Sequence, residues 1–114
     1  MPYTELSETG WEAQLGGNHL GHALFTALIL AKLAKPARVV NVSSWGHNMS
    51  PMHWDDLFFS KGATYDKWQA YGQSKTANIL FSVALNDKYA SRELSSVALH
   101  PGGTSCRYVL AEVS

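Results

Sequence analysis

The amino-acid sequence predicts an α/β protein built on a parallel sheet. Two short runs rich in apolar and β-branched residues, 38–43 and 96–100, have the composition of strands buried on both faces. A long segment with helical periodicity joins them, and another precedes the first run. Parallel neighbours need a long connection of this kind, so the order helix, strand, loop, helix, strand predicts parallel α/β architecture.

Length and charge narrow the class of protein. With 114 residues the chain allows one domain at most, and we treat 1–114 as a single partial domain. Hydrophobic residues make up 46%, as in ordinary soluble proteins. The formal net charge is zero and the basic residues are scattered, so no basic stripe indicates nucleic-acid binding.

No membrane span or secretory signal is predicted. The most apolar stretch, 23–31, is far shorter than the about 20 residues that a transmembrane helix needs. Residues 1–10 lack a basic region followed by an apolar run. The single cysteine, Cys106, has no partner for an internal disulfide, which fits a reducing compartment. We therefore expect a cytoplasmic protein.

The first helix is predicted over 11–34, with Ser7 or Thr9 as its N-cap. Its apolar residues recur at helical spacing: Leu20, Leu24, Leu28 and Ala31. The two glycines at 16–17 weaken it, each by about 1 kcal/mol relative to alanine. Pro36 ends it.

The remaining elements follow from local patterns. After the strand at 38–43, residues 45–66 show no clear period and are read as a long, functional loop with one helical turn. Residues 67–90 are helical, with an apolar stripe formed by Ala77, Phe81, Ala84 and Leu85. The second strand, 96–100, stops at the Pro-Gly-Gly of 101–103.

Tyr71 and Lys75 form a Tyr-x-x-x-Lys pattern. On a helix, residues four apart share one face. A tyrosine has an ordinary pKa near 10, and a neighbouring ammonium lowers that pKa by favouring the phenolate. The spacing therefore predicts a general acid/base, although a surface Tyr–Lys pair gives the same pattern.

Ser44 ends the first predicted strand. Open α/β sheets bind ligands beyond the carboxyl ends of their strands, where a hydroxyl can hydrogen-bond a carbonyl oxygen as charge develops. The alternative is that Ser43 and Ser44 only begin a loop. The helix carrying Tyr71 starts near the same edge, so we expect Ser44 and Tyr71 to converge.

Several other residues have both a functional and a purely structural interpretation. Asn18 is an amide in an apolar helix and is either functional or a residue that bends the helix. His19 and His22 have helical spacing for a metal, but zinc needs three or four ligands and no third is identifiable, so we predict no metal site. Pro101 and Gly102 allow close backbone approach to a ligand or simply end the strand.

Taken in order, these residues resemble motifs of the short-chain dehydrogenase/reductase family. The segments are Asn18-His19-Leu20-Gly21-His22, Val40-Asn41-Val42-Ser43-Ser44, Tyr71-x-x-x-Lys75 and His100-Pro101-Gly102. The resemblance covers about 8–102 and is closest to the retinol-dehydrogenase-like and WW-domain-oxidoreductase-like branch, especially its fungal members. It implies part of a Rossmann-type, doubly wound parallel sheet.

The resemblance also implies an NAD(P)-dependent oxidoreductase that interconverts a carbonyl and an alcohol by hydride transfer. By position, Tyr71 is the general acid/base, Lys75 lowers its pKa, Ser44 polarises the carbonyl, and Asn18 anchors a water of the proton relay. The implied cofactor-binding residues are Asn18, Tyr71, Lys75, Pro101 and Gly102. The branch favours NADP, with NAD as the alternative, and the substrate is a small carbonyl compound or alcohol that the sequence does not specify.

Two departures from the family pattern matter. The glycine-rich strand–turn–helix that binds pyrophosphate is absent, since no Gly-x-x-x-Gly-x-Gly or Gly-x-Gly-x-x-Gly occurs. After Pro101-Gly102 the family has a Ser or Thr near the position of Cys106. We therefore expect an interior piece of a longer protein, truncated at both ends, with little or no turnover by itself.

Two other functions remain open. The first is a catalytically inactive family member that acts only by protein–protein pairing, as a homo-oligomer through the helices at 11–34 and 67–90. The second is an epimerase or dehydratase of the family's extended branch, which the Asn-His-Leu-Gly-His segment at 18–22 disfavours. Cofactor binding by the purified chain distinguishes the first from an enzyme.

Overall fold

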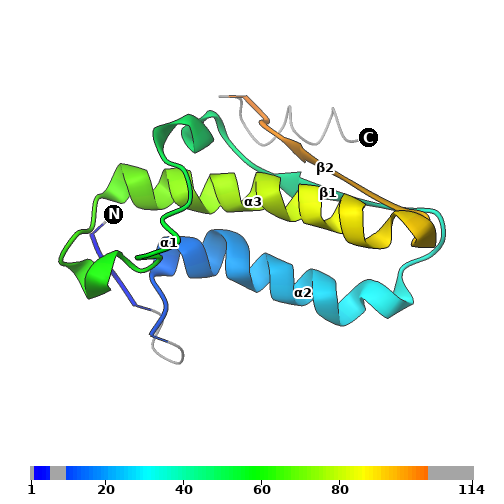
Figure 1. The fold of residues 1–114 in the computed structure, drawn as a ribbon, viewed down its shortest axis with the longest axis horizontal. Coiled ribbons are helices and arrows are strands. Elements are labelled where there is room, and N and C mark those ends of the chain that lie inside the picture. The colour runs from blue at the N-terminus through cyan, green and yellow to red at the C-terminus, as the bar shows by residue number, and fades with distance from the viewer. Residues whose placement is uncertain (1, 6–9, 103–114) are drawn as a thin grey trace.

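The computed structural model describes residues 2–5 and 10–102, and Figure 1 shows their arrangement. The elements follow the predicted order of helix, strand, loop, helix and strand. The helices are α1 (Ala13–Leu15), α2 (Gly21–Ile29) and α3 (Lys67–Tyr89), and the strands are β1 (Ala37–Val42) and β2 (Leu94–Leu99). The parallel α/β architecture predicted from the sequence is confirmed for this part of the chain.

The first helical segment is continuous but changes its winding. A π-helical turn, Gly16–Leu20, joins α1 to α2, and a 3₁₀ turn, Leu30–Lys32, ends the segment. Its N-cap is Glu12, whose carboxylate accepts the N–H groups of Gln14 and Leu15, each at 2.8 Å. The prediction of a Ser7 or Thr9 cap is thus wrong, and those two residues lie outside the described part.

The leucine stripe predicted for this helix does not face a core in the described part of the chain. The side chain of Leu24 is 58% exposed and that of Leu28 is 71% exposed, while Thr26 is the buried residue of α2. The reason is geometric, because the packing against α3 comes from α1 and the π turn rather than from α2. Periodicity identified an apolar face but not its partner.

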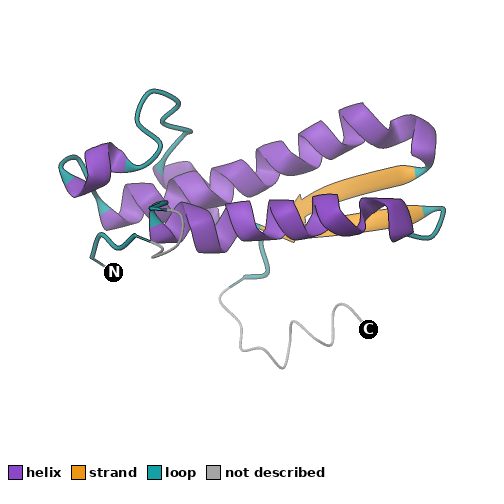
Figure 2. Cartoon of the chain, turned by 90° about the horizontal axis from the view of Figure 1, so that it is seen from below, coloured by secondary structure: helices purple, strands orange, loops and turns teal. Residues whose placement is uncertain are grey.

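The two strands are neighbours and run parallel. Their register pairs Ala37 with Leu94 at one end and Val42 with Leu99 at the other. Helix α3 connects them and packs on both. Figure 2 shows the strands beside the two long helices. The adjacent parallel pairing and the crossover helix predicted from the sequence are both confirmed.

The prediction that the strands are buried on both faces is wrong for the described residues. In β1, exposure alternates, with Val40 48% and Val42 51% exposed. In β2, Leu94 and Ser96 are buried while Val97 is 47% exposed. Alternation with period two means that α3 covers one face of the pair and leaves the other open.

The covered face contains hydrogen-bonded polar groups as well as apolar ones. The Asn41 amide donates to Ser82 Oγ at 2.7 Å, and Ser96 Oγ donates to the Val39 carbonyl at 3.0 Å. The Asn86 side chain accepts the Ser96 N–H at 2.7 Å and donates to the Ser96 carbonyl at 2.8 Å. Since each bond has a defined direction, these contacts fix how α3 sits on β2.

The loop at 45–66 contains two 3₁₀ turns, Trp45–Met49 and Phe59–Gly62, where the sequence predicted one helical turn. It is attached to α3 by Gln73, which is fully buried. The Gln73 side chain accepts the His53 N–H at 2.8 Å and donates to the Leu57 carbonyl at 3.0 Å.

In the described part of the chain, no helix combines the length and apolarity needed to cross a membrane.

Candidate active site

Ser44 lies just beyond the carboxyl end of β1. It caps the 3₁₀ turn Trp45–Met49, and its Oγ accepts the Gly46 N–H at 3.1 Å. That bond uses a lone pair of the oxygen and not the hydroxyl proton. The side chain is half-buried, and β2 ends at the same edge of the sheet. Ser44 therefore has the position at which parallel sheets bind ligands.

Tyr71 and Lys75 lie on one face of α3. Lys75 Nζ is 5.6 Å from the centroid of the Tyr71 ring. The same ammonium is 3.5 Å from the Val42 carbonyl oxygen, and Ser43 Oγ donates to the Lys75 carbonyl at 2.9 Å. These contacts hold the face carrying Tyr71 against the end of β1.

Two glycines let the turn after Ser44 lie directly against α3. A Cβ on Gly46 would stand 2.6 Å from Tyr71 Cε1, and a Cβ on Gly72 would stand 2.7 Å from the Gly46 carbonyl oxygen. Neither distance is tolerated between real atoms. The absence of both side chains thus brings the Tyr71 ring into contact with the turn that Ser44 caps.

Asn18 reaches α3 from the π turn. Its amide donates to Ser74 Oγ at 3.1 Å and to Gln14 Oε1 at 3.2 Å. Ser74 in turn donates to the Tyr71 carbonyl at 2.7 Å. Asn18 therefore bonds side chains rather than the backbone carbonyl expected of a residue that only bends the helix, and it bonds the residue immediately before Lys75.

Pro101 and Gly102 follow β2 at the same edge of the sheet as Ser44. Gly102 has φ +82°, in the left-handed region that favours glycine. Cys106, which the sequence comparison with the family pattern singled out, lies outside the described residues. The structure thus brings Ser44, Tyr71 and Lys75 together, with Asn18 one contact away and Pro101-Gly102 on the neighbouring strand end.

His19 is held by the helix opposite. Its Nδ1 is 3.0 Å from Asn78 Oδ1, and the Asn78 amide donates to the Val42 carbonyl at 3.0 Å. Because that amide oxygen only accepts, His19 carries its proton on Nδ1. Burial lowers the pKa of His19 below its usual value, and the hydrogen bond to Asn78 opposes this effect.

No group of three His, Cys, Asp or Glu side chains that could hold a metal occurs in 2–5 and 10–102.

A groove of about 410 Å³ lies between α2 and β1. Polar side chains that line it include Asn18, Asn41, Lys75 and Asn78. An ammonium and several amides match the hydroxyl-rich ribose of a nicotinamide nucleotide, so these residues fit the cofactor that the resemblance implies. The described residues contain no glycine-rich turn that leads from a strand into a helix, the element that holds pyrophosphate.

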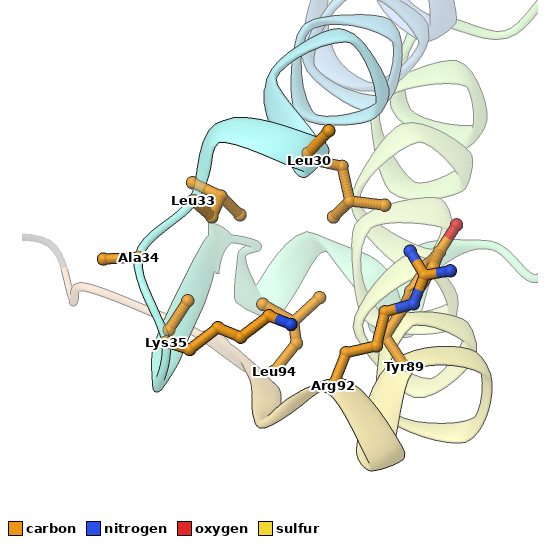
Figure 3. Close-up of a pocket in the computed structure, with 9 residues that line it drawn as sticks. Leu30, Leu33, Ala34, Lys35, Tyr89, Arg92 and Leu94 are labelled. Atoms are coloured by element: carbon orange, nitrogen blue, oxygen red, sulfur yellow. The ribbon is translucent and has the colours of Figure 1, made fainter.

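A second cavity, of about 230 Å³, lies at the opposite end of the strands (Figure 3). Ala37 and Leu94, which begin β1 and β2, line it together with Lys35 and Arg92. Ligands of parallel sheets bind at the carboxyl ends, so this cavity is remote from the candidate chemistry.

Sequence reasoning missed several residues that shape the site. Gly46 and Gly72 make the close crossing, and Gln73 anchors the loop. Gly72 and Gln73 lie inside the Tyr-x-x-x-Lys segment, where a glycine and an amide within a helix were a usable signal. The contact of Gly46 has no local signal, because its partner is distant in sequence.

The fold is that of a segment of an α/β protein with a Rossmann-like parallel sheet. No protein-family model matches the sequence. The chain is 43% identical over 104 residues (90% of this chain, 34% of the relative) to a protein of Streptomyces lividans named "Probable oxidoreductase". It is 42% identical over 103 residues (89% of this chain, 32% of the relative) to retinol dehydrogenase 12 of Homo sapiens.

One solved structure is also similar to this chain in fold and in sequence. The crystal structure of an uncharacterized protein from Mycobacterium paratuberculosis matches with a TM-score of 0.81 and 38% identity, over 96% of this chain and 40% of that chain. The chain is thus of the short-chain dehydrogenase/reductase family and is retinol-dehydrogenase-like. It spans about a third of the length of the relatives it matches.

Proposed function

We propose that this chain supplies the acid–base half of a carbonyl–alcohol oxidoreductase that uses NADP or NAD. The observation that supports this most is the contact between the Tyr71 ring and the turn capped by Ser44, with Lys75 on the same helix face. A hydroxyl, a phenol and an ammonium at the carboxyl edge of a parallel sheet are the groups that carbonyl reduction needs.

In the reduction, Ser44 donates a hydrogen bond to the substrate carbonyl oxygen, because its bond with Gly46 leaves the hydroxyl proton available. Tyr71 donates its phenolic proton to that oxygen as it becomes an alkoxide, and accepts the proton back in the oxidation. Lys75 places a positive charge beside the ring, which stabilises the negative charge that develops on Tyr71.

The nicotinamide cofactor, when bound, supplies or accepts the hydride. Lys75 and Asn18 line the groove beside β1 and would hold its ribose hydroxyls, and Pro101 and Gly102 would flank the nicotinamide. Asn18 has the further role of anchoring a relay water. The negative charge of the cofactor's pyrophosphate needs the N–H groups of a glycine-rich turn at a helix N-terminus, and such an element would have to come from outside the described residues.

The test is NADPH oxidation by the complete natural polypeptide that carries these residues, with a panel of aldehydes and ketones. Tyr71→Phe removes the proton donor and keeps the ring, so we expect turnover to fall by about 10²–10⁴-fold. Tyr89→Phe, on the same helix but far along it, is the matched control and should leave turnover unchanged. Equal rates in Tyr71→Phe and the parent protein would contradict the proposal.

A second candidate function is pairing without catalysis, as a homo-oligomer through the helices at 11–34 and 67–90. The observation in its favour is an apolar groove of about 310 Å³ between the π turn and α3, lined by Leu20, Leu80 and Phe81 among others. Light scattering after gel filtration tests it. Leu80→Glu should convert a dimer to a monomer, and a monomer in the parent protein rejects this function.

A further inference from the structure

An aromatic residue follows the candidate carbonyl-binding serine directly in the chain. Trp45 follows Ser44 in the chain, and its side chain is 68% exposed at the carboxyl edge of the sheet. Leu28 and Val40, which are also exposed, lie on the open faces of a helix and a strand. Trp45 differs from them because it belongs to a turn of the candidate site itself.

Two imidazole rings lie against the indole of Trp45. The backbone N–H of Trp45 donates to His100 Nδ1 at 3.1 Å, and the His100 ring meets the indole edge-on with ring centroids 5.9 Å apart. On the turn itself, His47 stacks with the indole at 6.4 Å and an interplanar angle of 16°. Since His47 Nδ1 lies 2.7 Å from the Ser44 carbonyl, both supports are tied to the site.

The arrangement joins the ends of both strands. Trp45 and His47 follow β1, whereas His100 follows β2, so three rings from two strand ends form one aromatic cluster. His100 Nδ1 accepts a hydrogen bond, so that nitrogen carries no hydrogen of its own, and residues 45–49 contain no acidic or lysine side chain. The cluster therefore presents an exposed aromatic surface, supported by two imidazole rings, at the edge of the sheet where Ser44 lies.

We propose that Trp45, supported by His47 and His100, is a specificity-determining residue that stacks on flat, uncharged aromatic carbonyl substrates. This inference rests on the proposed oxidoreductase function and names its substrate class. Stacking on a preorganised ring favours a planar substrate over a saturated one of the same skeleton, because only the planar π system can lie face to face with the indole.

The experiment compares naphthaldehyde with its fully saturated decalin counterpart as substrates of the complete polypeptide. Trp45→Ala should raise KM for naphthaldehyde by roughly 3- to 10-fold with kcat preserved, which is the range that aromatic pairs contribute. Trp45→Phe keeps a ring and should change KM by less than about twofold. Trp54→Ala, whose side chain is 71% exposed elsewhere on the loop, is the matched control.

A binding measurement separates this inference from the proposed function. Calorimetric titration with naphthalenemethanol, the alcohol product, reports affinity without turnover. A Kd that weakens in Trp45→Ala but not in Trp54→Ala supports the inference, even if the protein reduces no aldehyde. An unchanged Kd and an unchanged ratio of KM values between the two aldehydes would overturn it.

Discussion

The close crossing of α3 and the turn after β1 predicts the effect of adding one methyl group at Gly72. In Gly72→Ala the new Cβ would stand 2.7 Å from the Gly46 carbonyl oxygen and 3.0 Å from the Ser50 nitrogen. Both neighbours are backbone atoms and cannot rotate away, so the turn must move by about 0.7 Å to reach an ordinary contact.

The change in the free energy of unfolding for Gly72→Ala is the sum of two opposing effects. Overpacking costs about 1–3 kcal/mol, and alanine gains about 1 kcal/mol over glycine inside a helix. We expect Gly72→Ala to be destabilised by about 1–2 kcal/mol net, because the rigid backbone neighbours place the overpacking cost in the upper part of its range. Gly17→Ala is the control, since a Cβ there meets nothing within 4 Å. That variant should instead gain about 0.5–1 kcal/mol.

Urea unfolding followed by far-ultraviolet circular dichroism measures both variants. The transition midpoint should fall in Gly72→Ala and rise in Gly17→Ala, with the slope m unchanged in each. If Gly72→Ala were as stable as Gly17→Ala, the crossing described for Gly46 and Gly72 would be incorrect.

Three further predictions concern other parts of the chain. Burial lowers the pKa of His19 in the folded state, so the unfolded chain binds a proton on this residue more readily. The free energy of unfolding should therefore fall as the pH drops from about 6.5 through the lower pKa of the folded state. His19→Gln should flatten this pH dependence, measured as the urea midpoint at each pH. Asn86→Ala leaves the Ser96 N–H and carbonyl without their side-chain partner and should cost about 1–3 kcal/mol by urea unfolding, whereas the exposed neighbour Asp87→Ala should change little. Residues 1–114 alone should bind NADPH far more weakly than the complete polypeptide in a fluorescence titration, because helix N-termini with glycine-rich turns supply most of the pyrophosphate binding; equal affinity would refute this.

The sequence was informative where the signal is local. The β-branched runs and the long amphipathic segment between them were enough to predict two adjacent parallel strands with α3 as crossover. The i, i+4 spacing was enough to place Tyr71 and Lys75 on one face. Both depend only on backbone geometry within a single element or between consecutive ones.

Features that depend on tertiary partners were not predictable in the same way. Apolar periodicity marked Leu24 and Leu28 as one face of a helix, but it does not tell whether the partner of that face lies within the described residues. Glu12 is not a residue type that helix caps favour, and its capping role follows from the path of the chain. The contact between Gly46 and Tyr71 joins separate elements and leaves no trace in either local pattern.

The most direct test of the central claim is a pH profile of NADPH-dependent aldehyde reduction by the complete polypeptide, compared with Tyr71→Phe and Lys75→Met. If Tyr71 is the acid and Lys75 its neighbouring charge, Tyr71→Phe loses turnover at every pH. Lys75→Met should retain weak activity whose basic limb is displaced. Turnover in Tyr71→Phe equal to that of the parent protein, with an identical pH profile, would contradict the account.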